Sequence, residues 1–459
     1  MLRYSPLFFL SLVLTGSLFA EPRPFSDDGK FPFGVKPATL SDNLMQSEYE
    51  RWKAAVLVEC NGSYRVIGEN SGETRVEGIG FGMLLSAYAA DREVFDGLFD
   101  FYKSKQSASA NQMMAWQVSC DGTMDGGSAT DGDIDVAFSL IIAGQQWGEN
   151  YEEEAMKIID IMKDNVIVSC GDISALAPGV SGGKTWGGCS ETDISYYNPA
   201  FFREFARVSG DELWDKLADD TYTILDNGAN KSTGLIPDWQ SVSGSPGANG
   251  RVGYYRYDAC RAPYRIAIDY LWNGNEKAME WCTKISDWAY KQGPANIVDG
   301  YNLDGSRNGS SHTSSFTGSF GVAAMCNNQE IADSFGEEVD KLRDNRWFNL
   351  CCRCCYLMAL TGNQWKPVST GIRHGTVLKK ANDQNKPTVH YGNQFLHVRS
   401  GSDIHSIEIV SLSGKRMTMS YAANSSINSF DISALSRGVY FLRVHAADAV
   451  PETVKFIRK

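Results

Sequence analysis

The sequence predicts an all-α domain followed by a small all-β domain, and three observations support this. Residues 77–360 repeatedly show helix-length stretches with apolar residues three and four positions apart, broken by loops rich in Gly, Asp and Asn. Residues 367–387 contain few apolar side chains and many Lys, Gly, Asn, Ser and Thr residues, which is typical of a linker. Short β-type segments separated by turn residues follow. We therefore expect two folded units.

About a dozen helices are expected in the large domain, residues 21–366, and a small β-sandwich in residues 388–459. The clearest helical stretches are Met83–Ala90, Ile134–Trp147, Glu152–Asn165, Ala200–Val208, Asp211–Leu225, Ala262–Trp272, Glu276–Gln292, Glu330–Asp344 and Asn349–Leu360. The expected strands are Gln394–Arg399, Ile404–Ser411, Ser429–Ile432, Val439–Val444 and Thr453–Ile457.

The first 20 residues have the pattern of a signal peptide. Arg3 precedes an apolar run from Pro6 to Phe19, which ends at Ala20 and is too short to cross a membrane. We therefore expect residues 1–20 to be removed and the mature protein to be exported. An oxidising compartment favours disulfides, but the 11 Cys are odd in number, so at least one thiol should remain free.

Charge and histidine content exclude several functions. A formal net charge of −12 argues against a nucleic-acid partner, because such binding needs clustered Lys and Arg. Of the six His, only His312 lies in the large domain, so a zinc site with two or three His is excluded there and a Ser-His-Asp triad would need His312. Since His312 lies in a Ser-rich loop, we interpret it as a solvated or hydrogen-bonded loop residue. Acid and base chemistry then falls to Asp and Glu.

Two motifs resemble metal sites but lack the required spacing. The segment 131–135, Asp-Gly-Asp-Ile-Asp, begins like a calcium loop but has Val136 where Gly is needed and Ile142 where Glu is needed. Its three acids crowd a helix start, where capping explains one Asp and a ligand or proton-transfer site is the alternative. The second motif is Cys351, Cys352, Cys354 and Cys355, whose spacing suits buried apolar residues better than a metal site. No metal or other cofactor is expected.

Two carboxylates are candidates for acid and base work. Glu77 lies among alternating glycines, which would open space around it just before the helix expected from Met83. Burial there would raise its pKa and keep its proton at neutral pH; the alternative is a residue that caps a surface helix. Asp258 begins another expected helix, where Arg261 one turn later would hold it ionised, as a general base requires. The alternative for this pair is a structural contact.

Three segments together resemble glycoside hydrolase family 8. The segment Ala129-Thr130-Asp131-Gly132-Asp133 and the helix after it follow the signature of that family, with Val136 where Ile or Met is usual. Residues 76–83 resemble its general-acid segment, and residues 257–265 resemble its base segment. The resemblance implies an (α/α)6 toroid of six helical hairpins and an inverting glycosidase.

The resemblance also implies roles for individual residues. Glu77 would protonate the glycosidic oxygen, Asp258 would activate water on the opposite face, and Asp131 would bind and distort the sugar at the cleavage point. Arg261 would orient Asp258, and Tyr196 would lie near the water.

Two tryptophans are candidates for sugar binding. Trp116 and Trp186 would provide flat rings that match the apolar face of a β-linked glucose. The alternative for each is an ordinary core or loop residue.

The C-terminal unit resembles the sorting domain of type IX secretion. The similar segments are residues 407–415, 431–441 and 455–459. This implies passage across an outer membrane by secretion machinery, with removal of the domain or its attachment to the cell surface. A carbohydrate-binding module is the alternative, but no Trp occurs after Trp365.

The leading hypothesis is a secreted, monomeric, inverting endo-β-1,4-glucanase that hydrolyses cellulose or mixed-linkage β-glucan. The same machinery would also suit chitosan or xylan. A non-catalytic glucan-binding protein is the alternative from a different class.

Overall fold

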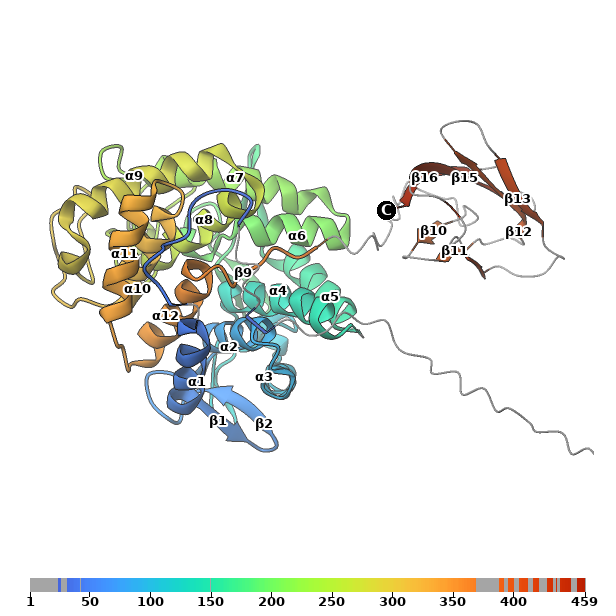
Figure 1. Ribbon diagram of the computed structural model, residues 1–459. Coiled ribbons are helices and arrows are strands. Elements are labelled where there is room, and N and C mark those ends of the chain that lie inside the picture. The colour runs from blue at the N-terminus through green and yellow to red at the C-terminus, as the bar shows by residue number, and fades with distance from the viewer. Residues whose placement is uncertain are drawn as a thin grey trace, which may run out of the picture.

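The computed structural model describes residues 24–25, 31–41, 43–148 and 150–368, together with seven C-terminal strands and Leu435 (Figure 1). The predicted signal peptide, residues 1–20, lies outside the described residues. So do residues 369–387 of the predicted linker. No helix in the described part of the chain has the length and apolar content of a membrane span.

Twelve α-helices are found in the described part of residues 24–368. They are α1 (Leu44–Val56), α2 (Val76–Tyr88), α3 (Arg92–Ser104), α4 (Thr130–Trp147), α5 (Tyr151–Val166), α6 (Pro199–Ser209), α7 (Glu212–Gly228), α8 (Ala262–Asn273), α9 (Glu276–Gln292), α10 (Ser314–Ala324), α11 (Gln329–Lys341) and α12 (Trp347–Leu360). The even-numbered helices pack in a closed order, α2 on α4, α4 on α6, α6 on α8, α8 on α10, α10 on α12 and α12 on α2. Each odd-numbered helix packs on one of them from outside. This arrangement is consistent with the expected (α/α)6 toroid.

The sequences of the helices explain which ones lie inside. All residues of α10 are buried, as are nearly all residues of α2 and α4, so these helices lack a polar face. The outer helix α3 buries one stripe, Val94, Phe95, Leu98, Phe99, Phe101 and Tyr102, and exposes its other side. Most of the expected helices are confirmed within a few residues, and α9 has the expected bounds. The uniform apolar and small residues of α10 give no periodic signal, which explains why that helix was not predicted.

Glycines bring α2 and α4 into close contact. A Cβ atom at Gly132 would lie 2.6 Å from the carbonyl carbon of Val76, and one at Gly80 would lie 2.8 Å from the Cβ atom of Asp135. Because residue numbers rise together along the contact, the two helices run parallel. The expectation that helix begins near Met83 is wrong, since α2 already begins at Val76. The alternating glycines are helical, and they allow the close packing of α2 on α4. The sequence had instead suggested that they open space around Glu77.

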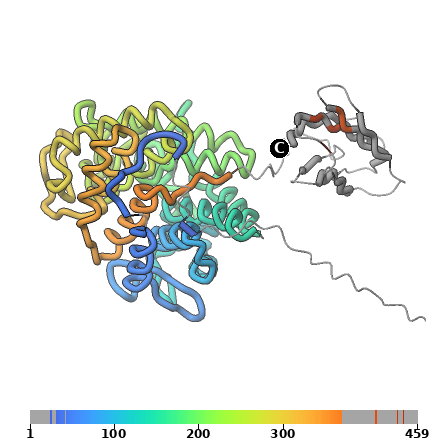
Figure 2. The backbone as a smooth tube through the Cα atoms, in the orientation of Figure 1, coloured from blue at the N-terminus to red at the C-terminus, as the bar shows by residue number. Residues whose placement is uncertain are grey.

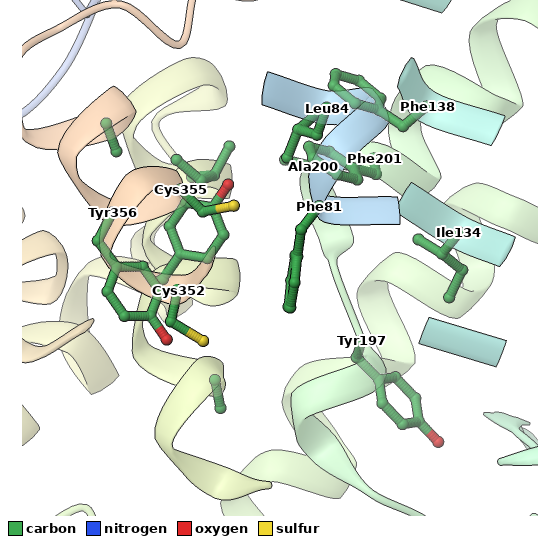
Figure 3. Packing of buried hydrophobic residues seen from close by; sticks show 14 of the residues in the cluster. Phe81, Leu84, Ile134, Phe138, Tyr197, Ala200, Phe201, Cys352, Cys355 and Tyr356 are labelled. Carbon is green, nitrogen blue, oxygen red and sulfur yellow. The ribbon is translucent and has the colours of Figure 1, made fainter. Parts of the chain in front are cut away.

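The interior of the ring is filled by aromatic and small apolar side chains. Phe138 of α4 stacks on Phe201 of α6 with ring centroids 3.6 Å apart. Figure 3 shows these two residues with Phe81 of α2 and with Cys352 and Cys355 of α12. All four cysteines of the α12 motif are buried, as predicted, and all four are free thiols.

The two terminal segments of the large domain cross the carboxyl ends of the inner helices (Figure 2). In the N-terminal segment, the Val35 N–H donates to the Met325 carbonyl, just after α10. In the C-terminal segment, the Trp365 carbonyl accepts from Tyr88 of α2, and Gln145 of α4 bonds both backbone groups of Val368. The terminal segments do not cover the opposite end of the ring, where the inner helices begin. Loops lie at that end.

The short strands before α10 lie in the loops between the helices. They are β1 (Leu57–Cys60), β2 (Ser63–Val66), β3 (Thr74–Arg75), β4 (Gln117–Val118), β5 (Thr123–Asp125), β6 (Ile167–Cys170), β7 (Ile173–Leu176), β8 (Gly179–Ser181) and β9 (Lys184–Trp186). They form antiparallel hairpins except for β3, which pairs with β4 across α2 and α3 in a three-stranded sheet.

The C-terminal strands form two antiparallel sheets. They are β10 (Thr388–Tyr391), β11 (Phe395–Arg399), β12 (Ile404–Ser411), β13 (Arg416–Ser420), β14 (Ile427–Asp431), β15 (Gly438–Ala446) and β16 (Glu452–Arg458). One sheet has the order β10-β11-β14 and the other has the order β13-β12-β15-β16. All five expected strands are present, although three of them, β14, β15 and β16, begin one or two residues earlier than expected.

Candidate active site

The amino ends of the inner helices carry the candidate acids. Glu77 is the second residue of α2, and Asp131 is the second residue of α4. Asp258 precedes the short 3-10 helix Ala259–Arg261, which leads into α8. Because the positive ends of helix dipoles favour negative charge, these positions suit carboxylates better than other buried sites do.

Arg261 joins the candidate acids. Its Nη1 atom lies 3.0 Å from Glu77 Oε2 and 2.5 Å from Asp131 Oδ2. Its Nη2 atom lies 3.5 Å from Asp258 Oδ1 and donates to Ser195 Oγ at 2.8 Å. The structure therefore brings all three predicted acids around one guanidinium. Arg261 is closer to Glu77 and Asp131 than to Asp258, the residue it was expected to orient.

Burial acts on both candidate catalytic groups. Burial raises the pKa of Glu77 to about 7, helped by the nearby Asp131 carboxylate and opposed by Arg261. Burial also raises the pKa of Asp258, but Arg261 and a hydrogen bond from the Trp239 indole favour its ionised form. The Asp258 side chain is 38% exposed and that of Glu77 is 17% exposed. Glu77 is thus the more shielded group and the better proton donor.

The three acids of the segment 131–135 point to different partners. Asp133 accepts a hydrogen bond from the Tyr102 hydroxyl at 2.6 Å, and Asp135 forms a two-point ion pair with Arg265. Burial raises the pKa of Asp133 to about 7, the same value as for Glu77, so this property alone does not identify the acid. Only Asp131 faces Arg261, and the crowding of these acids is explained by separate structural pairs.

Two adjoining hollows meet at Glu77 and Asp258. One, of about 150 Å³, is also lined by Trp116, Asp131 and Tyr196. The other, of about 200 Å³, continues on the far side toward the start of α12, where its further lining includes Glu69, Tyr257, Arg346, Trp347 and Phe348. A larger hollow of about 590 Å³ lies between α7 and α9, away from these acids. A chain passing through the two small hollows would lie against both candidate catalytic groups.

Aromatic side chains flank the acids on both sides. Near Glu77, the Arg75 guanidinium lies 5.8 Å from the Trp116 ring and 5.6 Å from the Trp347 ring. Near Asp258, Trp186 stacks on Trp239 with centroids 6.0 Å apart. The structure thus places Trp116 in a hollow with the candidate acids, whereas Trp186 lines neither hollow and contacts Trp239, the residue that bonds Asp258.

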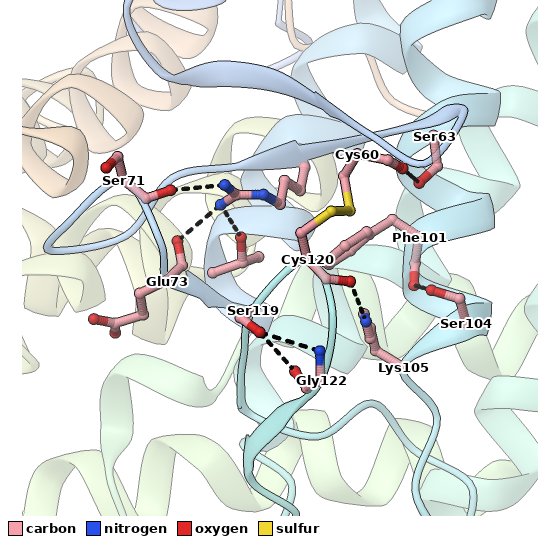
Figure 4. Close-up of a disulfide and its surroundings, with 12 residues drawn as sticks. Cys60, Ser63, Ser71, Glu73, Phe101, Ser104, Lys105, Ser119, Cys120 and Gly122 are labelled. Atoms are coloured by element: carbon pink, nitrogen blue, oxygen red, sulfur yellow. Dashed lines mark hydrogen bonds between the residues drawn. A yellow bond between two sulfur atoms is a disulfide. The ribbon is translucent and has the colours of Figure 1, made fainter.

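Two disulfides brace the loops that carry these aromatic residues. Cys60–Cys120 ties the β1–β2 hairpin to the loop after Trp116 (Figure 4). Cys170–Cys189 ties the β6–β7 hairpin to the segment that follows Trp186. The other seven cysteines are free and buried, in agreement with the expected presence of free thiols.

His312 is a hydrogen-bonded loop residue, as predicted. Its Nδ1 atom lies 2.7 Å from the Ile297 carbonyl oxygen, and its Nε2 atom lies 3.1 Å from Glu338 Oε1. These partners keep it out of the two hollows.

Two residues of the site carry no signal that sequence reasoning could use. Trp239 donates its indole N–H to Asp258 Oδ2 at 2.9 Å. Asp193 is fully buried, with Oδ2 3.7 Å from Arg261 Nη2, and burial raises its pKa well above the usual range. Both lie in loops far from Asp258 in sequence, so only the folded chain reveals the contacts.

Comparison with known proteins identifies the family. The profile of glycosyl hydrolases family 8 matches residues 25–351, and that of the secretion system C-terminal sorting domain matches residues 392–459. Endoglucanase C of Ruminiclostridium cellulolyticum is 34% identical over 78% of this chain and 81% of its own length. The beta-glucanase of Niallia circulans is 31% identical over 78% of this chain and 95% of its own length. The solved structure of a beta-1,3-1,4-glucanase from Paenibacillus sp. X4 superposes with a TM-score of 0.68 at 29% identity, covering 76% of this chain and all of that one. The chain therefore belongs to glycosyl hydrolases family 8 and carries a secretion system C-terminal sorting domain.

Proposed function

We propose that this chain is a secreted, inverting endo-β-1,4-glucanase that hydrolyses cellulose or mixed-linkage β-glucan by general acid and base catalysis. The observation that carries the proposal is the junction of two hollows at Glu77 and Asp258, with Arg261 in contact with both. The names of the endoglucanase and beta-glucanase relatives support a β-glucan as the substrate.

Glu77 acts as the general acid in this proposal. An acid must keep its proton until the glycosidic oxygen accepts it, and a pKa of about 7 allows this at neutral and acidic pH. Arg261 stabilises the carboxylate that remains after the proton has left, because its Nη1 atom lies 3.0 Å from Glu77.

Asp258 acts as the general base and takes a proton from the water that attacks the sugar from the opposite face. Its greater exposure leaves room for that water, and Arg261 together with Trp239 favours the ionised form. Tyr196 lines the hollow beside both groups and lies near the path of this water.

Asp131 binds and distorts the sugar at the cleavage point. Its Oδ2 atom contacts Arg261, whereas its Oδ1 atom is buried without a hydrogen-bond partner among the described residues. Trp116 and Trp186 stack against glucose rings on the two sides of the cleavage point.

The proposal is tested with Glu77→Gln and Asp258→Asn, which replace each carboxyl by an amide of the same shape. Each should lower sugar release from lichenan and carboxymethylcellulose at least about a thousandfold, while circular dichroism shows an unchanged fold. Glu154→Gln is the matched control and should keep full activity, because Glu154 is a partly exposed partner of Lys157 on α5, outside both hollows. Substantial residual activity in either active-site variant would contradict the assignment.

Product stereochemistry and substrate choice test the rest. Proton NMR of the first product should show the α-anomer, since inversion of a β-linkage produces it, and an initial β-anomer would exclude inversion. Faster sugar release from xylan or chitosan than from lichenan would replace the glucan by one of these polymers.

The remaining parts of the chain have proposed roles as well. Residues 1–20 act as a signal peptide, residues 21–366 form an (α/α)6 catalytic toroid, residues 367–387 form a linker, and residues 388–459 form a β-sandwich that engages the secretion machinery. The sorting domain supports export, and its removal or attachment at the cell surface follows export. We expect a monomer.

A further inference from the structure

Trp239 is the residue outside the predicted set that contacts Asp258 directly. Within the described residues, its indole is the one hydrogen-bond donor to the Asp258 carboxylate, at 2.9 Å from Oδ2. The other carboxylate oxygen, Oδ1, lies 3.5 Å from Arg261 Nη2, beyond a good hydrogen bond. One oxygen of Asp258 is therefore fixed by Trp239, and the other remains beside Arg261.

The surrounding backbone holds Trp239 rigidly in this position. Its N–H donates to the Val252 carbonyl, and its own carbonyl accepts from Gly247. The preceding residue, Asp238, accepts backbone N–H groups from Arg256 and Ala259, which flank the turn that carries Asp258. Residues 238 and 239 thus fix both the backbone and the side chain of Asp258.

The ring of Trp239 also belongs to the aromatic wall. It stacks on Trp186 at 6.0 Å and meets Tyr196 edge-on at 6.2 Å. The Arg251 guanidinium lies 4.7 Å from its centre. The contacts with Trp186 and Tyr196 therefore support the same indole that bonds Asp258.

We propose that Trp239 is a positioning residue that fixes the carboxylate of Asp258 through its indole N–H. This inference rests on the proposed function, in which Asp258 is the general base. Fixing one oxygen leaves the other free to receive the proton of the attacking water in a single orientation, which lowers the entropy lost on reaching the transition state. The indole N–H also stabilises the negative charge that a base must carry before it accepts that proton.

The effect on pH dependence depends on all charged groups that face Asp258. They are Arg261 on the same turn, Glu77 on α2, Asp131 on α4, Asp193 before α6, and Asp238 and Arg251 in the loops around Trp239. The two arginines favour the ionised carboxylate, and the acids oppose it. The Trp239 hydrogen bond acts in the same direction as the arginines, so its loss should raise the pKa of Asp258.

The test compares Trp239→Phe with Trp186→Phe, which both keep an aromatic ring. Trp239→Phe should lower kcat on lichenan roughly tenfold to a hundredfold with little change in KM. It should also move the acidic limb of kcat/KM to higher pH by roughly one pH unit. Trp186→Phe, at a residue proposed to bind sugar, should raise KM, and it should not move the acidic limb because Trp186 makes no hydrogen bond to Asp258. Trp239→His, which keeps a ring N–H, should recover part of kcat.

Several outcomes would overturn the inference. If Trp239→Phe changes only KM, or changes nothing, Trp239 does not position the base. If Asp258→Asn retains activity, the proposed function itself fails, which is a separate result. A measurement on the unaltered side chain keeps the inference testable if Trp239→Phe does not fold. In protein labelled with ¹⁵N-tryptophan, the chemical shift of the Trp239 indole proton should follow the titration of Asp258. Asp258→Asn should abolish that pH dependence. A chemical shift insensitive to pH in the wild type would contradict the hydrogen bond.

Discussion

The field that Asp131 exerts on Glu77 leads to a quantitative prediction for Asp131→Asn. The carboxylate oxygens of both residues contact Arg261 Nη1, at 3.0 Å and 2.5 Å, so they lie at most about 5.5 Å apart. At an effective dielectric constant of about 20 this separation corresponds to about 3 kcal/mol, and solvent near the partly exposed Glu77 reduces it to the order of 1–2 kcal/mol. Removing the charge should therefore lower the pKa of Glu77 from its value of about 7.

The sign of the effect on activity follows from the role of Glu77. A general acid works while it is protonated, so activity is present below its pKa and is lost as the pH rises through it. Asp131→Asn lowers that pKa, and it also frees Arg261 to interact more strongly with Glu77, which acts in the same direction. The basic limb of kcat/KM should therefore move to lower pH by about one pH unit.

The assay is the pH profile of the residual lichenase activity, each variant being scaled to its own maximum. A ¹³C NMR titration of the Glu77 carboxyl checks the result without substrate. Asp133→Asn is the matched control, since it lies on the same turn but bonds Tyr102, and its basic limb should stay in place. A basic limb that does not move in Asp131→Asn, or that moves to higher pH, would refute this account of Glu77.

Two further predictions concern stability. Gly132→Ala should lower the free energy of unfolding in urea by about 1–3 kcal/mol, because the new Cβ would lie 2.6 Å from the backbone of Val76. Gly144→Ala on the same helix is the control. Its new Cβ would lie 3.6 Å from the nearest atoms, so this substitution should be neutral or slightly stabilising. Equal effects of the two substitutions would contradict the close packing of α2 and α4. Replacing Cys170 and Cys189 by Ser should lower the free energy of unfolding by about 3 kcal/mol. Replacing Cys60 and Cys120 should lower it by about 4 kcal/mol, since this pair closes the longer loop. In a variant that lacks both disulfides, dithiothreitol should cause no further loss of stability. Further loss of stability on adding the reductant there would show that other cysteines pair.

The helices show what periodicity can predict and where it fails. The outer helix α9 has an apolar stripe and a polar face, so its bounds follow from the sequence. The inner helix α10 is buried on all sides and consists of small, apolar and hydroxyl residues, so no stripe marks it. The early start of α2 was hidden in the same way, because its glycines look like a loop until α4 is packed against them.

The site shows a similar division. The sequence indicated Glu77, Asp131 and Asp258 through short motifs at helix starts, and it indicated Arg261 through its spacing from Asp258. It could not tell that Asp133 and Asp135, in the same motif as Asp131, point to Tyr102 and Arg265. The direction of a side chain around a helix has meaning only when the neighbouring helices are known.

The sequence by itself determined the classes of chemistry and the order of the parts of this chain. The scarcity of His left acid and base work to carboxylates, and the change in composition after Trp365 separated the helical unit from the strands. The tertiary structure alone decided that four carboxylates surround Arg261 and that Trp239, rather than Arg261, fixes an oxygen of Asp258. The physical reason is that composition and periodicity are properties of the chain, whereas a charge field or a hydrogen bond between loops depends on distances that only the closed ring of helices sets.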